Sequence, residues 1–133
     1  MYNKILCVDD DPITLMLSKK VILKSNFSKE IDTVTNGVEA LNYFDNIIEK
    51  LKLNLNPIIP ELLFLDLNMP FMNGWEFLTL FSNENYSKIT STIKVIILSS
   101  TIDPSDIKKS KSFTIVSYFL SKPINKEMLK SLS

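Results

Sequence analysis

Five short apolar runs recur along the chain of 133 residues, and each is followed by a segment with helical spacing or helix-capping residues. The runs are typical of strands because they are short, apolar or rich in β-branched residues, and bounded by turn residues. Strands that alternate with helices indicate a parallel sheet with right-handed crossovers and helices on both faces. We therefore predict a doubly wound α/β fold, with strands at 4–8, 31–35, 62–65, 93–98 and 114–120 and a polar connection at 83–91.

The third run, Leu62 to Leu65, ends in a single carboxylate, Asp66. The run is apolar at every position, as expected of a strand that is covered on both faces. Open α/β sheets carry their sites where such strands meet their exit loops. Asp66 is therefore either a site residue or a cap of the following turn, and this stretch alone favours neither. The turn itself is predicted by Asn68, Pro70, Asn73 and Gly74.

The first predicted strand runs into three consecutive acids, Asp9, Asp10 and Asp11, and then Pro12. Asp11 and Pro12 predict the start of a helix, since Asp caps helices and Pro suits their first position. Three acids exceed what one cap needs, so Asp9 and Asp10 indicate a metal site. In the common strand order 2-1-3-4-5 the first and third strands are neighbours, which would place these acids beside Asp66.

Three close carboxylates repel one another, and a divalent cation such as Mg²⁺ relieves that repulsion because it prefers oxygen ligands. A carboxylate beside such a cation can act as a nucleophile and become an aspartyl phosphate. Phosphoryl transfer then requires positive charge and hydrogen-bond donors around the phosphate oxygens. The ends of the fourth and fifth predicted strands display Ser99, Ser100 and Lys122.

Four short motifs, each at the end of a predicted strand, carry a resemblance to a known family. They are CVDDDP at 7–12, FLDLNMPFMNG at 64–74, VIILSS at 95–100 and YFLSKP at 118–123. In this order they resemble the receiver domain of two-component response regulators, the CheY-like family. The resemblance covers essentially the whole chain. It implies a single receiver domain over 1–133 with a flavodoxin-like sheet in the order 2-1-3-4-5.

The resemblance also implies a role for particular residues. Asp66 is the expected phosphoacceptor. Mg²⁺ or Mn²⁺ is expected to bind Asp10 directly, Asp9 mainly through water, Asp66, and the backbone carbonyl of Asn68. The expected phosphate contacts are Ser99, Ser100 and Lys122, and the expected switch residues are Ser99 and Phe119.

The chain departs from the family pattern in four places. Ser99 stands where Thr is commoner, and Phe119 lacks the hydroxyl group of a Tyr. The family usually carries a Gly-Ala pair before the fifth strand, which residues 113–116 do not match. Residues 52–60 look like an insertion between the second helix and the third strand.

The composition excludes several kinds of function. Lysines and acids are equal at 15 each, with no Arg and no His, so His-based catalysis and His-ligated metal are excluded. Without net charge or Arg, we expect no direct binding of nucleic acid and no membrane partner. The single Cys7 predicts a core residue rather than a disulfide. No signal peptide or transmembrane stretch is apparent, so we expect a cytoplasmic protein.

Two other functions compete with a phosphorylation switch. A phosphatase of the haloacid-dehalogenase type needs a second Asp two residues after the nucleophile, where this chain has Asn68. A flavodoxin-like FMN carrier needs a phosphate loop after the first strand, where Asp9 to Asp11 would repel phosphate. We expect a switch rather than an enzyme, with only self-phosphorylation and self-dephosphorylation chemistry. Its expected partners are a sensor histidine kinase or phosphotransfer protein, and a downstream protein bound through the fourth helix, fifth strand and fifth helix.

Overall fold

The computed structural model describes residues 1–132 and contains five strands that alternate with helices, as predicted. The strands are β1 (Tyr2–Val8), β2 (Ser28–Val34), β3 (Leu62–Asp66), β4 (Lys94–Ser99) and β5 (Val116–Ser121). The helices are α1 (Pro12–Lys24), α2 (Gly37–Lys52), α3 (Gly74–Phe81), η1 (Glu84–Tyr86), α4 (Ser87–Thr90), α5 (Pro104–Ser110) and α6 (Lys126–Leu132). The predicted fourth and fifth helices are therefore α5 and α6.

All neighbouring strands are parallel, and their order is β2-β1-β3-β4-β5, which confirms the predicted fold. In this order β1 and β3 lie side by side, with Val8 paired to Leu65. The residues that follow these two positions, Asp9 and Asp66, are thus brought to the same edge of the sheet. Strand order and register together place the site.

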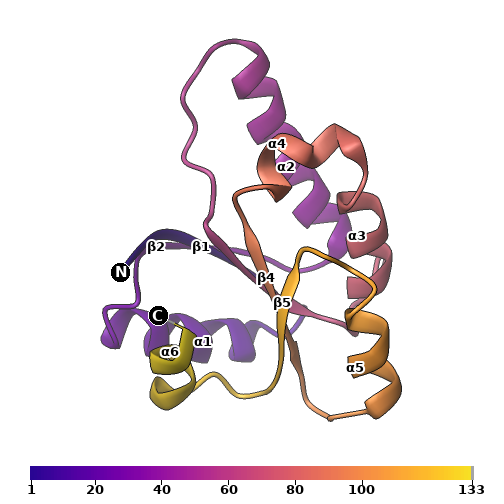
Figure 1. The fold of residues 1–133 in the computed structure, drawn as a ribbon. Helices are drawn as coiled ribbons and strands as arrows, with labels where there is room; N and C mark the ends of the chain where they lie inside the picture. The colour runs from indigo at the N-terminus through magenta and orange to yellow at the C-terminus, as the bar shows by residue number, and fades with distance from the viewer. Residues whose placement is uncertain (133) are drawn as a thin grey trace.

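Helices cover both faces of the sheet (Figure 1). The helices α1 and α6 lie on one face, over a core that includes Cys7, Phe64 and Leu98. The helices α2, α3 and α4 lie on the other face, over a core that includes Leu65 and Phe81. Successive residues of a strand point to opposite faces, so each central strand must be apolar at nearly every position.

One sequence prediction was wrong: the polar connection expected at 83–91 contains η1 and α4. The reason is tertiary packing, because Ile89 is fully buried against the core and Tyr86 packs on Phe81. The hydroxyl group of Tyr86 also donates a 2.6 Å hydrogen bond to Asp45 on α2. Two core-facing residues, Tyr86 and Ile89, in an otherwise polar segment give too weak a period to predict a helix.

The insertion expected at 52–60 begins at the last residue of α2 and projects beyond the sheet as an extended connection to β3 (Figure 1). Its apolar side chains are largely exposed, with Leu53 at 69%, Leu55 at 55% and Ile58 at 53%. The segment therefore adds mainly surface, while Ile59 and Pro60 at its end lie against the core.

Candidate functional site

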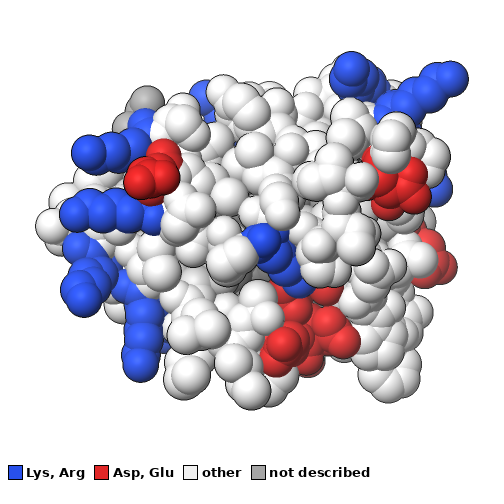
Figure 2. All heavy atoms as spheres, turned by 90° about the horizontal axis from the view of Figure 1, so that it is seen from below, with Lys and Arg blue, Asp and Glu red and all other residues white. Residues whose placement is uncertain are grey.

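Three carboxylates meet at the carboxyl ends of β1 and β3. One oxygen atom from each of Asp9, Asp10 and Asp66 lies within 4.8 Å of the others. Asp9 and Asp66 are buried, at 5% and 7% exposure, whereas Asp10 is exposed. Figure 2 shows a group of acidic side chains gathered on this face of the molecule. Asp9 and Asp66 are therefore held within the fold, and the cluster is open to solvent on the side of Asp10.

Lys122, the first residue after β5, brings a positive charge into this cluster. Its Nζ atom lies 2.6 Å from Oδ2 of Asp9 and 3.2 Å from Oδ1 of Asp66. Its backbone N–H donates a 2.8 Å hydrogen bond to the carbonyl oxygen of Ser99, which fixes the end of β5 against β4. A buried acid pair would be costly without this ammonium group.

The pKa values of Asp66 and Lys122 are shifted because these charged groups are partly buried and lie close to one another and to Asp9. Burial, and then the charge of Asp9, raise the pKa of Asp66, while Lys122 acts in the opposite direction. Burial alone would lower the pKa of Lys122, but its hydrogen bond to Asp9 and the charge of Asp66 outweigh this, so the pKa is raised. Lys122 therefore remains protonated at neutral pH and keeps a positive charge beside Asp9 and Asp66.

Asp11 caps α1, whereas Asp9 and Asp10 belong to the acidic cluster. Its Oδ1 accepts a 2.9 Å hydrogen bond from the backbone N–H of Ile13, and its Oδ2 accepts one of 3.0 Å from the hydroxyl group of Thr14. These bonds cap α1, as predicted, and the Ile13 bond chiefly lowers the pKa of Asp11. The Asp11 backbone N–H in turn donates to Oδ1 of Asp9 at 2.9 Å and orients that carboxylate.

The hydroxyl-bearing residues at the end of β4 differ in exposure. Ser99 is buried, and its Oγ accepts a 3.3 Å hydrogen bond from the backbone N–H of Thr101. Ser100 is exposed and lines a cavity of about 210 Å³ together with Lys122. Thr14 and Ser18 of α1 line the same cavity. The sequence analysis missed these two, although their position within two turns of the Asp11 cap was a usable signal.

Phe119 lies on β5 opposite Ile97 of β4, two residues before the partner of Ser99. Its ring is partly buried and packs against the core beneath α2 and α3. Ser99 and Phe119 therefore occupy neighbouring strands near the same edge of the sheet, and their role as a switch pair stays a prediction.

The loop between β3 and α3 passes close beneath the site. Asn73 and Glu76 form a capping box that starts α3. The N–H of Gly74 donates a 3.0 Å hydrogen bond to the carbonyl oxygen of Leu67. A Cβ atom at Gly74 would lie 2.5 Å from the carbonyl oxygen of Asp66, so only glycine allows this approach. The sequence analysis treated Gly74 only as a turn residue.

Taken together, the fold and the site define an α/β domain with an acidic, lysine-bridged centre at the carboxyl edge of its sheet. The sequence matches the family model of the response regulator receiver domain over residues 5–132. The chain belongs to this family, and the resemblance noted in the sequence is confirmed.

Solved structures of response regulators superimpose over almost the whole chain. A two-component response regulator from Cytophaga hutchinsonii is 31% identical, with a TM-score of 0.83 over 98% of this chain and 93% of that one. The phosphorylated cyanobacterial phytochrome response regulator RcpA is 28% identical, with a TM-score of 0.73 over 99% and 89% of the two chains. A response regulator in its Mn²⁺-bound form is 25% identical, with a TM-score of 0.69 over 98% and 88%. No curated protein sequence matches the chain.

The acidic cluster is consistent with the divalent metal that receiver domains bind, because all its donors are oxygen atoms. Among residues 1–132, no helix is long and apolar enough to cross a membrane. The cytoplasmic location stays a prediction.

Proposed function

We propose that this protein is a phosphorylation switch of a two-component phosphorelay, in which Asp66 accepts the phosphoryl group. The observation that carries the proposal is the meeting of three carboxylates from two neighbouring strands around the ammonium group of Lys122. The phosphorylated relative RcpA supports it, since it shares the fold over nearly its full length.

Asp9, Asp10 and Asp66, with the backbone carbonyl of Asn68, would hold Mg²⁺ or Mn²⁺. The oxygen-only donor set fits a hard cation, and the relative in a Mn²⁺-bound form agrees with this. When bound, the metal supplies positive charge that offsets the charge of the phosphate oxygens.

The transfer itself uses the carboxylate of Asp66. One of its oxygen atoms forms a bond to phosphorus while the bond between phosphorus and the donor atom breaks, and the leaving group keeps the electron pair. The donor is the phosphohistidine of a sensor kinase or phosphotransfer protein. Lys122, already 3.2 Å from Asp66, then neutralises a phosphate oxygen. The hydroxyl groups of Ser99 and Ser100 donate hydrogen bonds to the remaining oxygens.

The output follows from a shift of Ser99 toward the phosphoryl group. Ser99 would exchange its bond with Thr101 for one to phosphate and draw the loop after β4 inward. Phe119 would then turn into the space beneath that loop. The element nearest this change is α5, which buries only Ser110 and is therefore easily moved. The face made by α5, β5 and α6 would change and bind the downstream protein.

The test is treatment with acetyl phosphate in the presence of Mg²⁺, followed by intact-mass spectrometry. Wild type should gain one phosphoryl group that is labile to base, and Asp66→Asn should gain none. Phosphorylation of the variant at the wild-type rate would assign the acceptor elsewhere. Two controls separate the competing functions, since steady turnover of p-nitrophenyl phosphate indicates a phosphatase and a yellow protein indicates a flavin carrier.

The output face is tested by hydrogen exchange with and without beryllofluoride, which mimics the phosphoryl group. We expect protection changes within residues 101–122. Changes confined to the surroundings of Asp66 would contradict signalling through this face, and changes centred on 52–60 would move the output to the insertion.

A further inference from the structure

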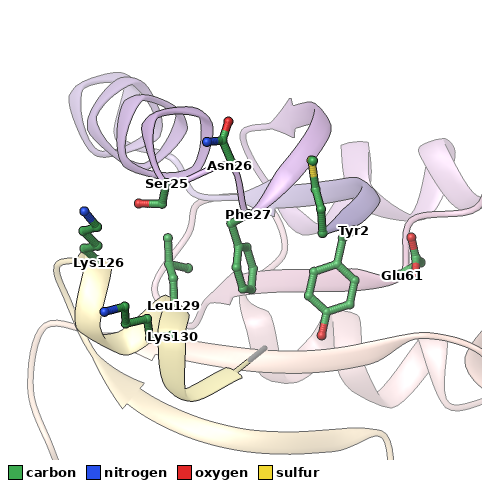
Figure 3. Close-up of a pocket in the computed structure, with 9 residues that line it drawn as sticks. Tyr2, Ser25, Asn26, Phe27, Glu61, Lys126, Leu129 and Lys130 are labelled. Carbon is green, nitrogen blue, oxygen red and sulfur yellow. The ribbon is translucent and has the colours of Figure 1, made fainter.

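A second cavity, of about 340 Å³, lies at the amino end of β1, between α1 and α6 (Figure 3). Tyr2, the first residue of β1, lines it, whereas Asp9 follows the last residue of the same strand. Seven strand residues span roughly 20 Å, so this cavity is separate from the acidic site. Its volume lies at the lower end of the range of small-molecule sites, about 300–1,000 Å³.

The middle of the cavity is aromatic and apolar. The rings of Tyr2 and Phe27 meet edge to face, with centroids 5.1 Å apart. Leu129 of α6 lines the same space and is 1% exposed. The three side chains belong to segments far apart in the sequence, and their packing fixes the walls. Such a space favours a flat apolar group.

Opposite charges stand at the two ends of this space (Figure 3). Lys126 and Lys130 line it from successive turns of α6, and Glu61 lines it from the position just before β3. Glu61 is held firmly, because its Oε1 accepts a 2.7 Å hydrogen bond from the N–H of Asn3 and its own N–H donates to the carbonyl of Lys4 at 3.0 Å. Its other carboxylate oxygen can accept a bond from a ligand.

The surrounding surface adds to the positive charge at one end. Figure 2 shows lysines gathered, with one smaller acidic group among them, at one end of the face that α1 and α6 form, away from the larger acidic group. The chain has no net charge, so the separation of lysines from acidic residues is a local feature of this face. The positive end would attract anions to the cavity. The exposed lysines of these two helices are Lys19, Lys20, Lys24, Lys126 and Lys130.

We propose that this cavity binds a small planar organic anion. The ring of the ligand lies on the packed side chains of Tyr2, Phe27 and Leu129, and its carboxylate or phosphate group faces Lys126. An N–H or O–H donor at the far end of the ring bonds to Glu61. The inference does not depend on the proposed phosphorylation, because none of these residues belongs to the acidic site.

The test uses three probes that share one benzene ring and differ in its substituents. 4-Aminobenzoate carries the ring, the anion and the donor, benzoate lacks the donor, and aniline lacks the anion. Each is titrated into ¹⁵N-labelled protein and followed by amide chemical shifts. 4-Aminobenzoate should give saturable shifts at Ser25, Phe27 and Leu129, with a Kd of about 1 mM as expected for a ligand of ten non-hydrogen atoms. Benzoate should bind more weakly, and aniline more weakly still.

Two variants of lining residues and one control assign the contacts. Lys126→Glu should weaken 4-aminobenzoate binding at least fivefold. Lys20→Glu makes the same charge change on α1 outside the cavity lining and should leave the Kd within twofold. Glu61→Gln should remove the difference between 4-aminobenzoate and benzoate.

Three outcomes would overturn the proposal. They are shifts at the cavity that do not saturate with 4-aminobenzoate, equal binding of aniline, and an unchanged Kd in Lys126→Glu. The acetyl phosphate reaction of Lys126→Glu should match that of wild type, so a failure at Asp66 and a failure at this cavity are distinguishable.

Discussion

The Nζ atom of Lys122 lies 2.6 Å from Oδ2 of Asp9, so this ammonium group holds a carboxylate that a bound metal would share. Asp9 cannot turn away from this contact, because its Oδ1 already accepts the N–H of Asp11. A divalent cation that enters the site must therefore compete with the ammonium group of Lys122. This competition makes the metal affinity depend on a residue that does not bind metal.

Lys122→Met should tighten Mg²⁺ binding roughly three- to tenfold. Two unit charges a few ångströms apart interact by about 1 kcal/mol in water, which corresponds to a roughly fivefold change in affinity. Isothermal titration calorimetry measures the Kd, with the exposed Lys88→Met as the control. Phosphorylation by acetyl phosphate should fall in the same Lys122 variant. Weaker Mg²⁺ binding in Lys122→Met would contradict competition between Mg²⁺ and the Lys122 ammonium group. It would mean that Lys122 instead holds the carboxylates in position for the metal.

Substitutions of the adjacent residues Asp10 and Asp11 should separate metal binding from helix capping. Asp10 contributes an oxygen atom to the cluster, whereas Asp11 caps α1. Asp10→Asn removes a charged ligand and should weaken Mg²⁺ binding at least tenfold. Asp11→Asn keeps a good cap and should change neither Mg²⁺ binding nor the unfolding midpoint appreciably. Equal losses of Mg²⁺ affinity in the two variants would show that net charge, not ligation, determines binding.

Gly74→Ala should lower the free energy of unfolding by about 2–3 kcal/mol, the cost of overpacking a tight site. The added Cβ would lie 2.5 Å from the carbonyl oxygen of Asp66 and 2.9 Å from Cα of Leu67, and neither backbone atom can move cheaply. Urea denaturation measures the loss. Thr79→Ala, on the exposed face of the same helix, should stay within about 0.5 kcal/mol of wild type. A Gly74→Ala protein as stable as the wild type would mean that the loop relaxes freely.

Some of these structural features could be predicted from the sequence and others could not. Strand order and the meeting of Asp9 with Asp66 were predictable because caps and apolar runs are local signals that a parallel sheet then assembles. The close approach of Gly74 to Asp66 depends on backbone geometry, which no pattern of residue types reports. The cavity beside Lys126 joins the start of β1, the end of α1 and α6, so only the assembled fold brings its walls together.

Cys7 should resist thiol reagents in the folded protein. Burial, and then the charge of Asp9, raise the pKa of its thiol from 9.0 to about 12. The folded state thus keeps the proton at a pH where the unfolded chain has lost it. Its contribution to stability is present below pH 9 and is lost as the pH rises toward 12. At pH 8 we expect DTNB to react only after denaturant is added. Rapid labelling of native protein would contradict the burial of Cys7.

The last prediction concerns Trp75, which ties α3 to α5. Its ring stacks on Phe113 with centroids 6.0 Å apart, and the Nζ atom of Lys109 lies 4.8 Å from the ring centroid. Because α5 buries only Ser110 among its own residues, this cluster is a main contact between α5 and the rest of the domain. A shift of α5 on phosphorylation would disturb the stack and change the emission of the single tryptophan.

We therefore expect beryllofluoride with Mg²⁺ to change Trp75 emission well beyond the effect of Mg²⁺ alone. Phe113→Leu removes the stacked ring and should reduce the change, whereas Asp66→Asn should abolish it. Binding of beryllofluoride by wild type, seen as ¹⁹F resonances of the complex, with no change in emission would show that α5 does not move. The signal would then have to leave the site by another element, and the exposed insertion at 52–60 would be the next to examine by hydrogen exchange.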